Sequence, residues 1–191
     1  MSNIITVTDP DEFADPYFIN WAERPDSGRV VTPTAVTSAL QLYDYQECAI
    51  TIDLSGPAVF LQRCNDQEFN YNFQPDDGVL LCDIAAGVRR LHLTFSVPGS
   101  AGFRAMGSHV SATGPVDADY SANLIVRLSD GSLASAMPQI GRLSRVRDTA
   151  PFIGAWAPSG LRIQEAMFSV SNLQAASQFL QLAISGLYFE V

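Results

Sequence analysis

Lysine is absent from this sequence, and positive charge of any kind is scarce. All 11 basic residues are arginines, spread along 191 residues that also carry 20 acidic ones, so the formal net charge is −9. A nucleic-acid-binding surface needs a basic stripe, and we therefore expect no nucleic-acid partner. An acidic surface is compatible with solubility, with salty surroundings or with calcium, and the charge alone selects none of them.

Cysteine and histidine are also rare. Three cysteines (Cys48, Cys64 and Cys82) cannot form a complete set of intramolecular disulfides. With only two histidines and no CxxC pair, the sequence predicts no zinc site. Cys82, in the apolar run VLLCDI, is typical of a buried free thiol. A disulfide between Cys48 and Cys64 stays open, since an oxidising compartment would allow it.

Long hydrophobic runs are missing as well. No segment approaches the ~18 consecutive apolar residues of a membrane-spanning helix. The first residues, MSNIITVTDPDEF, contain no basic region followed by an apolar stretch. We therefore expect neither a membrane span nor a signal peptide. A helical hydrophobic period is absent too, which argues against a fold built on amphipathic helices.

What the chain has in abundance is alternation. Between 88 and 97, Leu91, Leu93, Phe95 and Val97 alternate with polar residues, and similar stretches recur at 48–54 and 120–128. A period of two sends apolar side chains to one face of a strand. Frequent turn sequences separate these stretches. The sequence therefore predicts an all-β protein, a two-sheet antiparallel β-sandwich of jelly-roll type in one domain, 1–191. A closed barrel is the alternative.

Some strands carry finer detail. Apolar residues move from odd to even positions between 161 and 170, and from even to odd positions between 180 and 191. Such phase changes predict a bulge near Glu165 and a second one at Gly186. The segment EFNYNF predicts a strand with Phe69, Tyr71 and Phe73 on one side, followed by a turn that includes Asp76 and Asp77.

Segments along nearly the whole chain are similar to those of a known family. In order, they are DPYFINWAE, NYNFQPDDGVLL, LHLTFSVPGSAGFRAMG, DTAPFIGAWAPSGLRIQEAMFSV and LAISGLYF. Together they resemble a β-sandwich domain of exported bacterial proteins, many of which carry a C-terminal PEP-CTERM sorting tail, and we expect no such tail in this protein. The resemblance implies a jelly-roll sandwich, an extracellular or cell-surface location and no catalytic residues to carry over. Because no signal peptide is predicted, the compartment stays open.

Aromatic residues beside polar ones indicate a candidate sugar site. Sugars bind β-sandwiches through aromatic faces flanked by polar groups that fix their orientation. Tyr43 and Tyr45 lie in the polar segment QLYDYQEC, Trp156 lies in GAWAPSG, and Arg90 and His92 lie on the polar face of 88–97. We expect the ligand-binding groups among these five. The alternatives are a core or rim position for Trp156 and a solvated face for Arg90 and His92.

Acidic residues gather near the N-terminus and suggest calcium. Asp9, Asp11, Glu12 and Asp15 are close in sequence, and Glu190 ends the last predicted strand. Calcium prefers hard oxygen ligands, and jelly-roll modules often hold it between their first segment and last strand. We expect Asp9, Asp11, Asp15 and Glu190 as ligands of a structural calcium ion. The alternative is a solvated acidic loop, because the spacing matches no calcium-loop motif.

Catalytic motifs are missing. His92 and His109 have serines nearby, but no nucleophile-elbow sequence accompanies them. We therefore expect no enzyme, but a non-catalytic binding module for a glycan or an extracellular polymer. The first alternative is a structural or interaction protein that self-assembles or docks a protein partner through a sheet face. A degenerate hydrolase is the second alternative, and the oligomeric state stays open.

Overall fold

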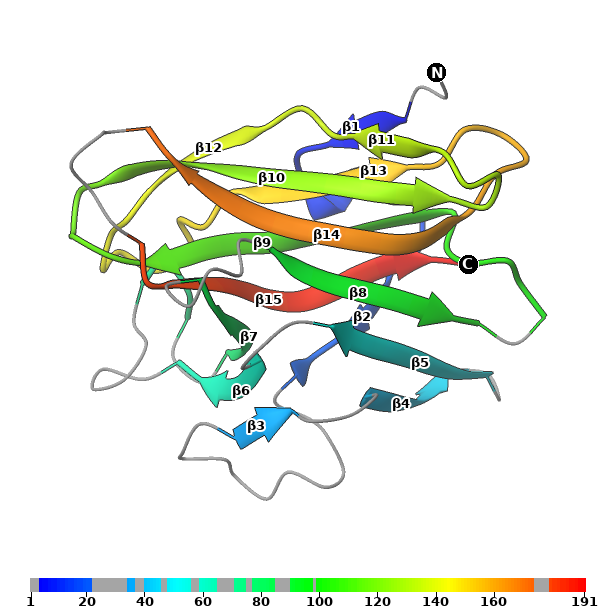
Figure 1. Ribbon diagram of the computed structural model, residues 1–191, viewed down its shortest axis with the longest axis horizontal. Coiled ribbons are helices and arrows are strands. Elements are labelled where there is room, and N and C mark those ends of the chain that lie inside the picture. The colour runs from blue at the N-terminus through cyan, green and yellow to red at the C-terminus, as the bar shows by residue number, and fades with distance from the viewer. Residues whose placement is uncertain are drawn as a thin grey trace.

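A computed structural model of the chain has two antiparallel β-sheets packed face to face (Figure 1). It describes residues 4–21, 34–36, 40–45, 48–55, 59–64, 71–74, 77–84, 90–97, 99–173 and 179–191. Within these ranges the chain forms strands and one short 3-10 helix, η1 (Pro10–Glu12), but no α-helix. No helix there is long and apolar enough to span a membrane. The all-β sandwich predicted from alternation is confirmed.

The two sheets have eight and seven strands in the described part of the chain. The first runs β1 (Ile5–Val7), β13 (Phe152–Trp156), β9 (Ala105–Thr113), β15 (Gln181–Glu190), β7 (Gly78–Asp83), β6 (Val59–Arg63) and β3 (Thr34–Val36), and β2 (Tyr17–Ile19) also pairs with β15. The second runs β11 (Leu133–Ser135), β10 (Asp119–Leu128), β14 (Ile163–Asn172), β8 (Leu91–Ser96), β5 (Cys48–Ser55) and β4 (Leu40–Tyr45), and β12 (Gln139–Arg142) also pairs with β10.

From β7 onward the chain crosses repeatedly between the sheets. The spatial order is β7-β15-β9-β13 in one sheet and β8-β14-β10-β11 in the other. In both sheets, strands from the end of the chain lie between strands from its middle, as Figure 1 shows for β14 and β15. This interleaving is the arrangement of a jelly roll.

The core lies between the sheets, and the alternating residues build it. Leu91 and Leu93 of β8 are fully buried, and every second residue of β10 from Tyr120 to Leu128 is at most 1% exposed. Full burial of such apolar side chains contributes about 1.5–3 kcal/mol each. The buried Tyr120 hydroxyl donates to the Val110 carbonyl of the opposite sheet at 2.8 Å, so this polar group also has a partner.

Both predicted bulges are present. In β14, Glu165 pairs with Arg127 while Ile163 pairs with Leu128, so Gln164 is the extra residue. In β15, the pairing with β9 jumps from Ile184 to Leu187 and leaves Ser185 and Gly186 together opposite His109. The sequence revealed both because a bulge reverses the phase of the alternation.

The second bulge marks a fork in the eight-stranded sheet. On one edge of β15, residues 181–184 pair with β7, whereas residues 187–189 pair with β2. The change of partner falls at Ser185 and Gly186. The neighbouring strand therefore changes from β7 to β2 at this point of β15, and the backbone of Ser185 and Gly186 departs from regular pairing.

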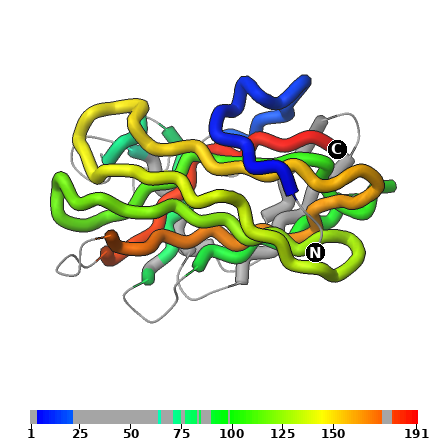
Figure 2. Tube along the Cα trace, turned by 90° about the horizontal axis from the view of Figure 1, so that it is seen from above, coloured from blue at the N-terminus to red at the C-terminus, as the bar shows by residue number. Residues whose placement is uncertain are grey.

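Two apolar clusters cover parts of the outer face of this sheet. One contains Val7, Phe13, Ala105 and Phe152 and lies under the N-terminal segment. Figure 2 shows this segment, in blue, outside the layer that contains β15. The other cluster joins Cys64, Phe73, Val79, Leu81, Ala150 and Ala183. The outer face between the clusters is where a cavity can form.

One expectation is wrong, and one open alternative is excluded. Tyr71 to Phe73 form bends and not a strand, because Asn72 has a positive φ of 65° that strands do not accommodate; residues 65–70 lie outside the described ranges. Cys64 is a buried free thiol, which rules out the Cys48–Cys64 pair left open above, and Cys82 is buried as expected. Burial, with the nearby Asp77 charge, raises the pKa of Cys64 to about 12.

Candidate functional site

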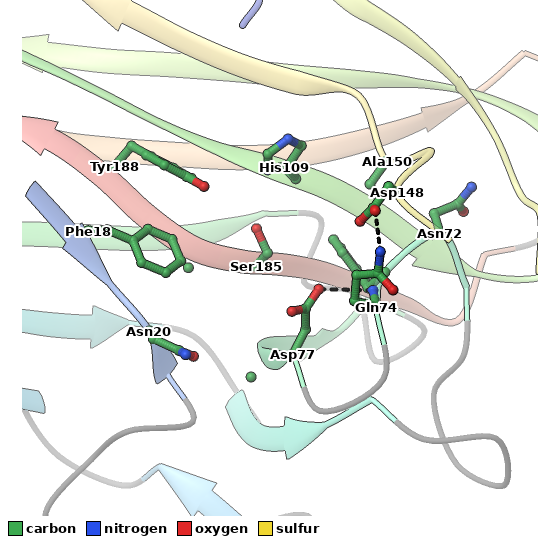
Figure 3. Close-up of a pocket in the computed structure, with 13 residues that line it drawn as sticks. Phe18, Asn20, Asn72, Gln74, Asp77, His109, Asp148, Ala150, Ser185 and Tyr188 are labelled. Carbon is green, nitrogen blue, oxygen red and sulfur yellow. Dashed lines mark hydrogen bonds between the residues drawn. The ribbon is translucent and has the colours of Figure 1, made fainter. Parts of the chain in front are cut away.

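A pocket of about 290 Å³ opens at the fork between β2 and β7 (Figure 3). Its size is close to the lower end of the ~300–1,000 Å³ typical of small-molecule sites. Thirteen of the described residues line it, from the N-terminal segment, β7, β9, β15 and two loops: Phe18, Asn20, Asn72, Phe73, Gln74, Asp77, Gly78, His109, Asp148, Ala150, Ser185, Gly186 and Tyr188. The pocket thus brings together segments that are far apart in sequence.

The floor of the pocket is formed by β9 and β15, which contribute the lining residues His109, Ser185 and Tyr188. Their strand neighbours Val110 and Leu187 belong to the core between the sheets, so alternation sends these three side chains to the outer face. Ser185 is only 8% exposed, and its hydroxyl has no hydrogen-bond partner among the described residues. It faces the pocket (Figure 3), where a ligand could satisfy it.

Gly186 allows β2 to approach the floor closely. A Cβ atom at this position would lie 2.3 Å from the Phe18 ring and 2.5 Å from the Ile19 carbonyl oxygen. Both distances are shorter than any van der Waals contact, and the second involves backbone that cannot rotate away. Because Gly186 has no side chain, Phe18 can reach the pocket.

One wall of the pocket is acidic and is organised by Gln74. The Gln74 backbone N–H donates to Asp77 Oδ2 at 2.9 Å, and its side-chain Nε2 donates to Asp148 Oδ2. Burial raises the pKa of Asp77, the bond from Gln74 opposes this rise, and the charge of Asp148 adds to it. The two carboxylates are thus held close enough to interact, in a fixed relative geometry.

The opposite wall is aromatic. The rings of Phe18 and Tyr188 are 4.6 Å apart at an angle of 44°, and Phe18 is 51% exposed. Burial raises the pKa of Tyr188, and the negative charges of Asp77 and Asp11 raise it further. Figure 3 places this pair across the pocket from Gln74 and Asp148.

His109 lies between the two walls. Its ring meets the Phe152 ring edge-on at a centroid distance of 5.1 Å. Burial lowers the pKa of His109, although the charges of Asp148 and Asp9 act in the opposite direction. The imidazole is therefore neutral at pH 7 and offers one donor and one acceptor.

Asn72 anchors the loops that carry the acidic wall. Its side-chain Nδ2 donates to the Arg142 carbonyl at 2.9 Å and to Thr149 Oγ1 at 2.6 Å. Its Oδ1 accepts from Ser111 Oγ at 3.0 Å and from the Ser144 N–H at 3.4 Å. The residue is fully buried, so it joins the loop before β7 to the loop that carries Asp148.

Of the five residues predicted to bind sugar, Trp156 lies apart from Arg90 and His92. Trp156 is on β13, where it contacts the Phe13 ring at 6.1 Å and the Arg104 guanidinium at 4.7 Å. Arg90 and His92 belong to the other sheet. The side chains of Tyr43 and Tyr45, on β4, lie outside what the structure describes. Trp156, Arg90 and His92 are not among the described residues that line the pocket.

His92 instead takes part in a small ionic cluster on β8, β10 and β14. His92 Nε2 and Arg127 Nε each lie 3.0 Å from Glu165 Oε2. Burial alone would raise the pKa of Glu165, but hydrogen bonds from Arg127 and His92 hold it below its usual value. Arg90 Nη1 contacts Met167 Sδ at 3.5 Å. These contacts account for the polar face of β8 without a ligand.

The carboxylates predicted to bind calcium make contacts within the chain. Asp9 Oδ1 accepts from the Asp11 N–H at 2.9 Å, so it caps the helix η1. Glu190 Oε1 accepts from the Ala14 N–H at 2.7 Å, which ties the N-terminal segment to the last strand. Asp15 is exposed. In the described ranges no three His, Cys, Asp or Glu side chains are grouped to hold a metal, and calcium stays a prediction.

Sequence reasoning missed most of the pocket. Asp77 was expected in a turn, and its N–H does donate to the Gln74 carbonyl at 3.2 Å, but nothing local indicated that it meets Asp148. His109 was considered only as a lone histidine. The one usable signal was the phase change at Gly186, because bulges often accompany functional sites.

Comparison with known proteins adds no relative. No family model matches the chain, and no curated protein or solved structure matches it either. The structure alone establishes a two-sheet antiparallel β-sandwich with a pocket on the outer face of one sheet.

Proposed function

We propose that this chain is a non-catalytic jelly-roll binding module whose pocket takes a sugar unit of a glycan or an extracellular polymer. The observation that carries the proposal is the pairing of an aromatic wall, Phe18 and Tyr188, with a polar wall across one small cavity. Aromatic faces pack on the C–H patches of a sugar, and carboxylates and hydroxyls bind its hydroxyl groups. The resemblance to exported sandwich domains supports an extracellular ligand.

Tyr188→Ala should weaken sugar binding about tenfold, which is about 1.4 kcal/mol, because it removes one aromatic face and one hydroxyl. The measurement is isothermal titration with a panel of soluble oligosaccharides. His92→Ala tests the alternative site on the other sheet and should leave the dissociation constant unchanged. If His92→Ala lost sugar affinity and Tyr188→Ala did not, the sugar would bind on the other sheet and the proposal would be wrong.

A second candidate function is docking of a protein partner, and exposed apolar side chains at one sandwich edge favour it. β1 forms the edge of one sheet, and β11 and β12 form the edge of the other (Figure 1). The Met137 N–H donates to Thr6 Oγ1 at 2.8 Å across these edges. Four exposed side chains lie there: Ile5 at 69%, Leu133 at 56%, Met137 at 69% and Ile140 at 65%. Exposed apolar edges mark interaction surfaces.

If this edge mediates self-association, the double variant Met137→Asp/Ile140→Asp should shift the protein to monomer by placing charges in the contact. Sedimentation velocity over a range of concentrations measures this. Leu173→Asp is the matched control, because Leu173 is 51% exposed but follows β14, which lies on the other side of β10 from β11 and β12. A parent protein that is monomeric at every concentration would rule out self-association.

A further inference from the structure

The charge of the pocket is one-sided. Asp77 and Asp148 both line it, no arginine is among the described residues of the lining, and the chain contains no lysine. His109, the remaining titratable base in the lining, is held neutral by burial. An anionic ligand such as a sulfate, a phosphate or a uronic acid would meet two carboxylates and no cation. The lining therefore disfavours acidic sugars and favours a group that carries positive charge.

The acidic pair is preorganised and does not form a solvated cluster. Gln74 donates to both carboxylates, and each contact uses one oxygen of its partner. Asp77 Oδ1 and Asp148 Oδ1 have no hydrogen-bond partner among the described residues. Both donor groups belong to Gln74. The two carboxylate oxygens that Gln74 does not contact, Asp77 Oδ1 and Asp148 Oδ1, are therefore held at a fixed separation. Preorganised acceptors lose little entropy when they bind a donor.

A second observation, independent of the acids, points to a ligand. The Ser185 hydroxyl has no hydrogen-bond partner among the described residues and belongs to a residue that is only 8% exposed. It faces the same cavity as the carboxylates (Figure 3). Buried polar groups normally have partners, so this hydroxyl is suited to a hydrogen-bonding group inside the pocket. The nearby faces of Tyr188 and Phe18 also attract cations through their ring quadrupoles.

We infer that the pocket selects an amino sugar, with the protonated amine between Asp77 and Asp148, the ring against Tyr188 and Phe18, and a hydroxyl on Ser185. This inference rests on the proposed function and adds the class of sugar. An ammonium group supplies three donors, which suits two carboxylate oxygens. The small cavity holds one sugar unit and not a long chain, so the remainder of a polymer would extend outward past the exposed Phe18.

The test compares sugars that differ only in the amine. A short β-linked glucosamine oligomer, its N-acetylated form and the glucose oligomer of equal length are titrated into the full chain by calorimetry at slightly acidic pH. We expect the free amine to bind at least ~10-fold more tightly than either neutral sugar, since it gains charge-assisted hydrogen bonds. Equal or tighter binding of the neutral sugars overturns the inference but keeps sugar binding. No binding by any of the three contradicts the proposed function as well.

Variants separate the pocket from the acidic surface as a whole. Asp148→Asn and Asp77→Asn should each remove the preference for the amine, while Asp117→Asn, which removes the same charge from an exposed carboxylate paired with Arg142 at 3.3 Å, should keep it. Equal losses in all three would indicate general attraction to a chain of net charge −9 and would overturn the inference. A simple diamine that binds as well as the amino sugar would also overturn it, because the sugar ring would then contribute nothing.

Discussion

Asn72→Ala should destabilise the protein by about 5 kcal/mol, since it removes four side-chain hydrogen bonds at about 1 kcal/mol each and places alanine at a positive φ. Ser111, Arg142, Ser144 and Thr149 would each lose a partner, and Asn72 is fully buried, so water does not readily replace it. Denaturation in urea measures the change. Because native stability is only about 5–15 kcal/mol in total, the loss should be large and easy to detect.

Asn72→Gly separates the two contributions. Glycine accepts the φ of 65° without strain but lacks the amide, so it should be about 1 kcal/mol less destabilising than alanine. Asn123→Ala is the matched control for loss of an asparagine amide at a partly exposed position, where the amide donates to Ser121 O and Ser171 Oγ. If Asn72→Ala cost no more than Asn123→Ala, the anchoring role of Asn72 would be wrong. Sugar binding should fall with Asn72→Ala even below the unfolding transition, since the loop that carries Asp148 is released.

The fold followed from the sequence because its signal is local. Alternation in 91–97 and 120–128 reports which face of each strand is buried, and the structure buries those residues. Even the bulges were readable, since an inserted residue shifts the phase of its own strand. The segment around Tyr71 failed for a local reason too: alternating aromatics resemble a strand, but Asn72 takes the left-handed conformation that asparagine tolerates.

The pocket could not be predicted in the same way because its parts are distant in sequence. Asp148 and Gln74 are 74 residues apart, and neither belongs to a strand. Their contact depends on the Asn72 side chain, which joins the loop before β7 to the loop that carries Asp148. By contrast, Arg90, His92 and Trp156 looked promising because they are polar or aromatic on predicted strands, yet each contacts neighbours within the chain. Residue type alone does not distinguish polar side chains that pair within the chain from polar side chains that are available to a ligand.

Gly102→Ala should destabilise the protein by about 4 kcal/mol or more, because it combines a steric clash in the core with a backbone conformation that alanine rarely adopts. A Cβ atom there would lie 2.2 Å from the Ile163 carbonyl oxygen. That oxygen accepts from the Phe103 N–H at 2.9 Å, and Phe103 O accepts from the Ile163 N–H at 2.7 Å. The clash would therefore separate the backbone pair that fixes Phe103, whose fully buried ring packs against Phe95 and Phe189.

Gly131→Ala is the control that isolates the conformational part of this effect. Gly131 has a φ of +83°, similar in sign to the +133° of Gly102, but an added Cβ would meet nothing within 4 Å. Its cost should be about 1 kcal/mol, from backbone strain alone. Urea denaturation of both variants gives the comparison. If the two variants lose equal stability, a small backbone shift relieves the clash with Ile163, and the contact between the start of β14 and the segment before β9 is not rigid. If Gly102→Ala loses several times more unfolding free energy than Gly131→Ala, this contact is rigid. It then holds Phe103 in the core beside β15, and the bulge of β15 at Gly186 lies in the floor of the pocket.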